Sequence, residues 1–205
     1  MNKDIPEFSL QRMPVYLNYL RTLPDDGNYN FISSGAIAQA LGLGEVLVRK
    51  DLAYTGCAGR PKVGYPRVEL ISALENFLCV NDAKSAVIVG AGGLGRALLC
   101  YGGFKNYGIE LACAFDTDPE KIGTEVGGKP ILPVEQLQEA CKKYGAVLAI
   151  IAVPASAAQQ TAELLKKAGI KAILNFAPAQ ITACDGVKVI NIDVAANLAI
   201  LASML

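Results

Sequence analysis

Apolar residues in the first third of the chain recur at helical spacing. Over residues 9–23 the leucines and a methionine fall about 3.6 positions apart, which predicts a first helix. A second helix is expected from a serine cap at Ser33 or Ser34 to a stop at Gly42. The polar segment between the two, residues 24–30, predicts a turn.

A third helix is expected over residues 45–54, with Val46, Leu47 and Leu52 on its inward side. Because only a short glycine-containing turn separates it from the second helix, the pair predicts a helix-turn-helix, whose second helix can enter a major groove. The glycine-rich segment 56–65 then predicts a small β-hairpin. A hairpin in this place would be the wing of a winged helix.

The hydrophobic pattern changes near residue 82. A helical pattern over residues 66–80 ends in a polar stretch, and from residue 85 short apolar runs alternate with helical patterns. This alternation is typical of βαβ units and a parallel sheet. The expected strands are residues 86–90, 111–115, 146–153, 172–176 and 188–192. The expected helices are residues 94–104, 134–143 and 156–168.

The last stretch, residues 194–205, is almost uniformly apolar. A helix that is apolar on all sides must be covered, most simply by a second subunit. The fold class is therefore α/β, with a winged helix-turn-helix domain (1–82), a Rossmann domain (83–193) and a terminal dimerisation helix (194–205). That helix is either short or continues beyond Leu205.

A glycine-rich GxGxxG motif follows the first expected strand and opens a helix. Its glycines let the backbone turn tightly and approach a pyrophosphate, which binds at the helix N-terminus. The motif is Gly90, Ala91, Gly92, Gly93, Leu94 and Gly95. Asp116, at the end of the second expected strand, would accept hydrogen bonds from an adenine ribose and repel a 2′-phosphate, which favours NAD over NADP. The alternatives are a relic of a nucleotide fold, or a site for FAD or a methyl donor.

Other residues at the carboxyl ends of the expected strands extend this site. Asp118 and Lys121 either contact the adenosine or merely cap and decorate a short helix. Asn175 and Pro178 close a strand at the edge where such sheets bind ligands, so contact with the nicotinamide side is expected.

Composition narrows the function classes. The 205 residues are 52% hydrophobic and 19% charged, with no apolar run long enough to span a bilayer and no signal-peptide core, so we expect a soluble, cytoplasmic protein without a membrane partner. The absence of histidine excludes histidine-containing hydrolase triads, and no metal site is expected. Six cysteines without a CxxC pair are expected to be small core residues, with a thiol switch as the alternative. They are Cys57, Cys79, Cys100, Cys113, Cys141 and Cys184.

Charge is balanced overall and in each half of the chain, but it is not evenly spread. Residues 48–67 contain five basic side chains against the single acid Asp51. Arg49 and Lys50 lie on the helix expected to enter the groove, whereas Arg60 and Lys62 lie on the hairpin and would meet phosphate or the minor groove. A solvated basic face is the alternative, and the neighbouring wing favours DNA.

An enzymatic reading depends on Tyr101 and Lys105, which form the YxxxK pattern of short-chain dehydrogenases. The pair begins 11 residues after Gly90, far upstream of its place in that family, so we expect no catalytic residues. The short second half also leaves little room for a substrate domain. A small NAD(H)-dependent oxidoreductase with an N-terminal dimerisation region remains the alternative to cofactor binding without turnover.

Seven motifs in order make the chain resemble the bacterial redox-sensing transcriptional repressor family Rex over nearly its whole length. They are VRKDLAYTG (48–56), GRPKVGY (59–65), VGAGGLGRAL (89–98), FDTDPEKIG (115–123), VPASAAQ (153–159), ILNFAP (173–178) and VINID (189–193). The resemblance implies a homodimer that holds an inverted-repeat operator in double-stranded DNA. NADH would release that operator, and NAD would compete with NADH. It also adds Val153 and Pro154 to the cofactor site and Tyr65 to the DNA contacts.

The resemblance further implies that the terminal helix is swapped between subunits and that three residues couple the two sites. Asp193 would change partners between Tyr101 and Arg21. The alternative is that Asp193 only caps the terminal helix. Two departures stand out, since relatives often have glycine where this wing has Lys62, and some carry an aromatic residue in place of Val194.

Overall fold

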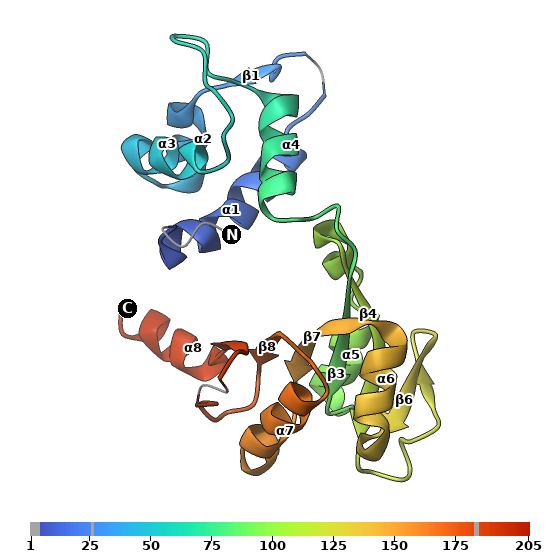
Figure 1. Cartoon of the computed structure of the whole chain (residues 1–205). Helices are drawn as coiled ribbons and strands as arrows, with labels where there is room; N and C mark the ends of the chain where they lie inside the picture. The colour runs from blue at the N-terminus through green and yellow to red at the C-terminus, as the bar shows by residue number, and fades with distance from the viewer. Residues whose placement is uncertain (1–4, 26, 183–184) are drawn as a thin grey trace. The chain divides into compact units, whose positions relative to one another are not determined.

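The computed structural model describes residues 5–25, 27–182 and 185–205, and the chain divides into two compact units, Met1–Asp82 and Ala83–Leu205. The first unit consists of short helices around one small sheet (Figure 1). Its helices are α1 (Glu7–Thr22), α2 (Ser34–Leu41), α3 (Glu45–Ala53) and α4 (Arg67–Phe77). Its strands, β1 (Phe31–Ile32) and β2 (Tyr65–Pro66), pair antiparallel.

Local sequence explains where the helices of this unit begin and end. The Ser33 side chain accepts a hydrogen bond of 3.0 Å from the backbone N–H of Ala36 and so caps α2. Gly42 ends the helix in the left-handed conformation that glycine adopts readily. The four helices expected from apolar spacing are all present, which confirms the helix-turn-helix formed by α2 and α3.

The expected inward face of α3 is confirmed for Leu52 but wrong for Val46 and Leu47. Val46 is 60% exposed and Leu47 is 38% exposed, whereas the buried residues are Val48, Asp51 and Leu52. The spacing of apolar residues does not show which face of α3 is buried, because the charged residue Asp51 is part of that face. Asp51 points inward since its carboxylate is bound there by side chains of α1.

The wing is also shorter than a regular hairpin. In the segment between α3 and α4, Arg60 and Gly64 form an isolated antiparallel bridge, and the chain leaving the wing pairs with β1. Gly64 has a φ of 102°, and a Cβ there would collide with the carbonyl group of Ile32. The close approach of the wing to β1 therefore requires glycine at this position.

The second unit is a seven-stranded sheet with the order β5-β6-β4-β3-β7-β8-β9. The strands are β3 (Lys84–Val89), β4 (Ile109–Asp116), β5 (Glu125–Val126), β6 (Lys129–Pro133), β7 (Ala146–Ile151), β8 (Ala172–Asn175) and β9 (Lys188–Asn191). All neighbours pair parallel except β5 and β6. Five of these strands match the sequence-based expectation, which confirms the parallel sheet. The β5–β6 hairpin was not expected, because β5 is very short and β6 contains two prolines.

Helices cover both faces of this sheet. One apolar core lies under α6 (Leu137–Tyr144) and α7 (Ala155–Lys167), and another lies under α5 (Gly93–Cys100) and the 3-10 helix η1 (Gly102–Tyr107) (Figure 1). The expected helix over residues 94–104 thus breaks into α5 and η1, and the one over residues 134–143 begins as a 3-10 turn, η2 (Val134–Gln136). The terminal helix α8 (Val194–Ala202) has no buried residue.

The cysteines only partly follow the expectation that they are core residues. Cys113 and Cys141 are buried, Cys57 is half-buried, and Cys79 and Cys100 are exposed, which corrects the expectation for the last two. Burial raises the pKa of the Cys113 thiol to about 12, so it stays protonated and unreactive. Cys184 lies outside the described residues.

Candidate functional site

The glycine motif forms the tight loop between β3 and α5, and its glycines have different roles. A Cβ on Gly90 (φ 101°) would collide with the carbonyl group of Ala152, and one on Gly95 would collide with the carbonyl oxygen of Gly90. These two glycines therefore serve the packing of the loop. Gly92 precedes the first turn of α5, and a Cβ there would meet nothing within 4 Å. Open space at a helix N-terminus is what a pyrophosphate requires.

A cleft of about 680 Å³ lies at the carboxyl ends of β3, β4 and β7, at the point where the strand order reverses. Such switch points are where open α/β sheets bind their ligands. The cleft brings together seven of the expected cofactor residues. They are Gly90, Gly92, Asp116, Asp118, Lys121, Val153 and Pro154. Gly92 and the acidic end of the cleft fit the pyrophosphate and adenosine ribose of NAD(H).

Asp116, at the end of β4, is held by donors on every side. Its Oδ2 accepts a hydrogen bond of 2.8 Å from the backbone N–H of Ala91, and its Oδ1 accepts bonds of 2.9 Å from those of Thr117 and Asp118. The ammonium group of Lys121 lies 3.4 Å from Oδ2. Burial alone would raise the pKa of Asp116, but these hydrogen bonds and Lys121 lower it below its ordinary value. The carboxylate is therefore charged and fixed in place.

Lys121 bridges the two acids of the cleft, since its Nζ also lies 3.1 Å from Oδ2 of Asp118. The pKa of Asp118 is lowered by the backbone N–H of Glu120 and by Lys121. A ribose hydroxyl that approaches Asp116 would replace the long contact with Lys121, because the shorter bonds to backbone N–H groups hold the loop. The sequence pattern indicates Asp116 as a ribose-binding acid, but it does not indicate that Lys121 occupies the same carboxylate oxygen.

A second cavity of about 420 Å³ lies where the sheet ends in β8 and β9. Leu94, Pro178, Asp193 and Val194 all line it, so the helix that follows the glycine motif is brought next to the start of α8. Leu94 is 46% exposed. The expected nicotinamide-side residue Pro178 is thus placed beside the expected coupling residue Asp193.

Asn175 holds two residues that line this cavity, Ala179 and Asn191, by hydrogen bonds. Its side chain is fully buried, donates hydrogen bonds to the Ala179 carbonyl (2.7 Å) and to Oδ1 of Asn191 (2.8 Å), and accepts one from the Ala177 N–H (2.9 Å). It lines neither cavity. The amide joins the loop after β8 to β9, which is a structural role in place of the expected cofactor contact.

The three expected coupling residues have partners within their own units. Arg21, at the end of α1, forms an ion pair of 2.8 Å with Glu75 of α4. Asp193 caps α8 by accepting a hydrogen bond of 2.8 Å from the Ala196 N–H. Tyr101 is 60% exposed, and its ring lies edge-on to that of Phe104 with centroids 5.3 Å apart.

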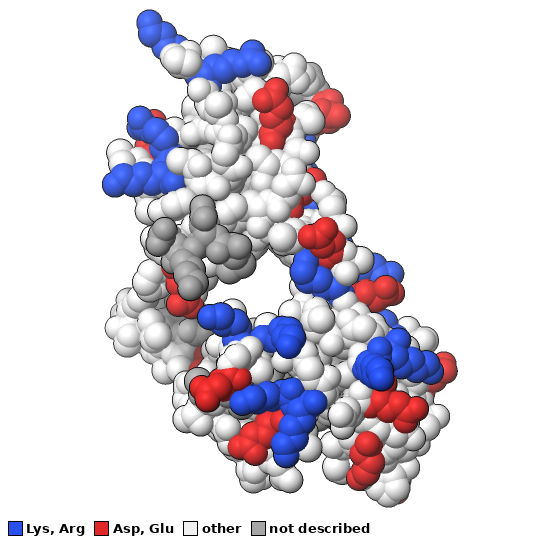
Figure 2. Space-filling view, in the orientation of Figure 1, with Lys and Arg blue, Asp and Glu red and all other residues white. Residues whose placement is uncertain are grey.

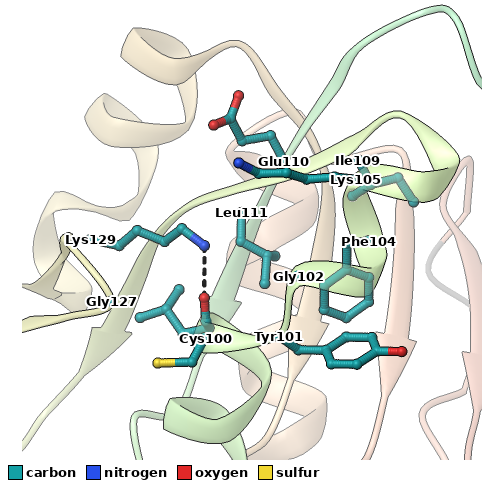
Figure 3. Close-up of a pocket in the computed structure, with 11 residues that line it drawn as sticks. Cys100, Tyr101, Gly102, Phe104, Lys105, Ile109, Glu110, Leu111, Gly127 and Lys129 are labelled. Atoms are coloured by element: carbon teal, nitrogen blue, oxygen red, sulfur yellow. Dashed lines mark hydrogen bonds between the residues drawn. The ribbon is translucent and has the colours of Figure 1, made fainter.

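Tyr101 also borders a third cavity, of about 260 Å³, which Figure 3 shows between α5, η1 and the first residues of β4. Lys129 reaches across it and donates a hydrogen bond of 2.7 Å to the Leu99 carbonyl at the end of α5. Because β4 begins here, this cavity lies at the amino-terminal edge of the sheet, opposite to the glycine loop. It is separate from the cofactor cleft.

The four basic residues expected to contact DNA lie on α3 and the wing, where Figure 2 shows Lys and Arg side chains at the surface. Arg49 is 59% exposed and pairs with Glu45 at 3.3 Å, and Lys50 is exposed. On the wing, the guanidinium of Arg60 lies 5.1 Å above the centre of the Phe31 ring, a cation–π contact that holds it in place. The exposed side chains of Arg49 and Lys50 on α3 are accessible to a binding partner.

Two wing residues have special conformations. Lys62 has a φ of 61°, in the left-handed region that glycine adopts more readily than lysine. A glycine, as other members of the resembled family often have here, would suit this backbone. Tyr65 is only 8% exposed, and a Cβ on Gly59 would touch its ring at 3.1 Å. Tyr65 therefore supports the wing from below and does not face solvent as a DNA contact would.

Exposed apolar residues of α3 and of its C-cap were not predicted as candidates for contact with DNA. Val46, Leu47 and Tyr54 are exposed beside Arg49 and Lys50. Apolar side chains read the methyl group of thymine in the major groove. Of these, only Val46 could have been found from the helical spacing, since it lies about 140° from Asp51 around the helix, whereas Leu47 and Tyr54 lie within about 60° of it.

Comparisons with known proteins agree with this architecture. A model described as the N-terminus of a putative DNA-binding protein matches residues 4–53, and a CoA-binding domain model matches residues 81–179. The redox-sensing transcriptional repressor Rex of Treponema denticola is 42% identical over 96% of this chain and 93% of its own length. Rex of Porphyromonas gingivalis is 37% identical over 98% of this chain and 92% of its own length.

Solved structures of a Rex-family repressor match nearly the whole chain. RSP in complex with β-NAD⁺ and operator DNA matches with a TM-score of 0.92 and 28% identity, covering 99% of this chain and 93% of that one. RSP in complex with β-NADH matches with a TM-score of 0.87, and covers 99% of this chain and 95% of that one.

A helix-turn-helix domain followed by a dinucleotide-type Rossmann domain defines a transcription regulator that contains a cofactor-binding fold. Its curated relatives are named as repressors, and the protein is a regulator, not an enzyme. The chain belongs to the Rex family of redox-sensing transcriptional repressors. In the described part of the chain, no helix has both the length and the apolar character needed to cross a membrane.

The glycine loop yields a matched pair of substitutions. Gly90→Ala should lower the thermal midpoint of the second unit, because its Cβ collides with a backbone carbonyl and its φ is left-handed; we expect a loss of about 2–4 kcal/mol. Gly92→Ala should leave the midpoint within 1–2 °C, because its Cβ meets open space. Thermal unfolding followed by circular dichroism measures both. Equal midpoints would contradict the division of roles between the two glycines.

Proposed function

We propose that this chain is an NADH-responsive repressor that binds an inverted-repeat operator as a homodimer and releases it when NADH replaces NAD. The observation that carries the proposal is that one chain joins an outward-facing recognition helix to a cleft with the glycine cradle and carboxylate of a dinucleotide site. RSP, the structural relative, is seen with β-NAD⁺ and operator DNA and with β-NADH. Because operator DNA and the NADH pool are cytoplasmic in bacteria, we place the protein there.

The exposed apolar surface of helix α8 is an argument for a homodimer. Its side chains are exposed although the helix is strongly apolar, with Val194, Leu198, Ile200 and Leu201 each more than half exposed. Water-exposed apolar area of this kind is stabilised when a partner covers it. We propose that α8 is exchanged between two subunits, with residues 1–82, 83–193 and 194–205 as the three functional parts.

A gel shift tests this function. Duplexes selected from a random pool for binding to the native protein should be retained with NAD and released with NADH. A substrate-dependent change in NADH absorbance without any DNA retention would instead favour the rival oxidoreductase.

Base reading and phosphate binding can be separated within the basic surface. Arg49→Ala should relax sequence preference by about 1–3 kcal/mol, because α3 is the helix that enters the groove. Lys62→Gly should weaken binding to all sequences alike and reduce the salt slope by about one, since it removes one phosphate contact while relieving the left-handed backbone. Anisotropy titrations with labelled duplexes measure both effects. Native selectivity in folded Arg49→Ala would contradict this placement of α3.

The preference for NADH over NADPH depends on Asp116 and on Lys121, which contacts its carboxylate. The native protein should bind NADH much more tightly than NADPH, because a 2′-phosphate meets the fixed carboxylate. In Asp116→Asn the gap should shrink, since Lys121 loses a partner and becomes available to the phosphate. The lowered pKa of Asp116 keeps the carboxylate charged above about pH 5, so the NADH affinity should not change through titration of Asp116 between about pH 5 and pH 8. Titration followed by NADH emission measures these affinities, and equal native affinity for both cofactors would refute the assignment.

Capping by Asp193 can be distinguished from coupling, with Arg21 and Tyr101 as its proposed partners. Asparagine caps a helix as well as aspartate does but carries no charge. Asp193→Asn should therefore keep α8 and still bind both NADH and DNA, yet NADH should release the DNA much less effectively. Gel shifts across an NADH titration measure this release. Native release in Asp193→Asn would show that Asp193 is only a cap.

A further inference from the structure

A buried ion pair in the first unit has no role in the proposed DNA and cofactor contacts. Asp51 of α3 is 1% exposed, and Arg12 of α1 holds it with two bonds, from Nε at 2.6 Å and from Nη2 at 2.9 Å. The hydroxyl of Tyr16, one turn further along α1, donates a third bond of 2.6 Å to the same carboxylate. Three donors from one helix therefore converge on one acid of another.

The charges of this cluster are well defined. Burial alone would raise the pKa of Asp51, but the hydrogen bonds from Arg12, Tyr16 and Ser9 lower it below its ordinary value. Burial raises the pKa of Tyr16 to about 12, with the charge of Asp51 acting in the same direction. Asp51 is thus a carboxylate and Tyr16 a neutral donor at physiological pH.

Apart from Asp51, few contacts fix the orientation of α3, and among the described residues the other polar one between helices is the hydrogen bond of 3.2 Å from Ser34 Oγ of α2 to Oε1 of Glu45. The nine residues of α3 bury only Val48 and Leu52 besides Asp51. Because successive helical residues are about 100° apart, Arg49 lies about 200° from Asp51, on the opposite face. Two apolar contacts resist separation of the helices but only weakly resist rolling. A roll of about 20° moves a side-chain tip ~8 Å from the axis by ~3 Å, which exceeds the tolerance of a hydrogen bond.

Stability does not explain the ion pair. Replacing a buried ion pair by apolar residues of similar size is often neutral or stabilising, because the charges no longer have to be desolvated. A forked, bidentate contact instead fixes direction as well as distance. We propose that Arg12 and Tyr16 are positioning residues that fix, through Asp51, the rotation of α3 about its own axis. This inference rests on the proposed function, since the rotation matters only if α3 reads DNA.

The test compares three full-length variants with the native protein. Arg12→Met/Asp51→Leu replaces the pair by apolar side chains, Arg12→Lys keeps the charge but loses the fork, and Tyr16→Phe removes one hydrogen bond. For each variant, anisotropy gives the affinity for a selected operator duplex and for a random duplex. NADH emission gives cofactor affinity, and thermal unfolding gives the midpoint.

We expect Arg12→Met/Asp51→Leu to unfold at or above the native midpoint and to bind NADH within twofold of the native affinity. Its operator affinity should fall about 10- to 100-fold, the equivalent of one or two lost base contacts, whereas its affinity for random duplex should change by less than about threefold. Arg12→Lys and Tyr16→Phe should show smaller losses of selectivity in the same direction.

Native operator affinity and selectivity in the folded double variant would overturn the proposal. If the double variant does not fold, Arg12→Lys and Tyr16→Phe decide, and native selectivity in both would overturn it equally. Failure of the proposed function is a different result, because in that case the native protein itself retains no duplex.

Discussion

A hydrogen bond between the glycine loop and the end of a neighbouring strand organises the cofactor-binding unit. The carboxylate of Asp116 accepts the backbone N–H of Ala91 and so ties the glycine loop after β3 to the end of β4. Gly90 brings the same loop against the backbone after β7. These contacts hold the N-terminus of α5 at the point where the strand order reverses, and the cleft forms there as a consequence. The acid that we propose selects the cofactor therefore also builds the site.

The DNA-binding unit follows a similar principle with a different acid. Asp51 is held by α1, and the far end of α1 is held in turn by α4, through the Arg21–Glu75 ion pair and through Arg67, whose guanidinium donates to three carbonyls including that of Leu20. Helix α1 thus connects the recognition helix with the helix that leads to the second unit.

Periodicity and glycine chemistry were sufficient to predict the two units, the helix-turn-helix and five parallel strands, because these depend on local rules. The phase of α3 and the role of Tyr65 were not predictable in this way. Both depend on contacts between distant segments, since Asp51 enters the core only because Arg12 lies beside it. The same reason applies to Asn175, whose position marks a ligand edge while its amide is used by β9 and the neighbouring loop. Short edge strands with proline, such as β6, also escape a periodic pattern.

Redox sensing requires that NADH and operator DNA favour different states of one molecule, and this coupling must be reciprocal. The most direct measurement is a complete binding cycle at one salt concentration. It comprises operator affinity with and without saturating NADH, and NADH affinity with and without saturating operator. We expect NADH to weaken operator binding by a factor of about 5–150, and operator to weaken NADH binding by the same factor. Two affinities that are each independent of the other ligand would contradict the account.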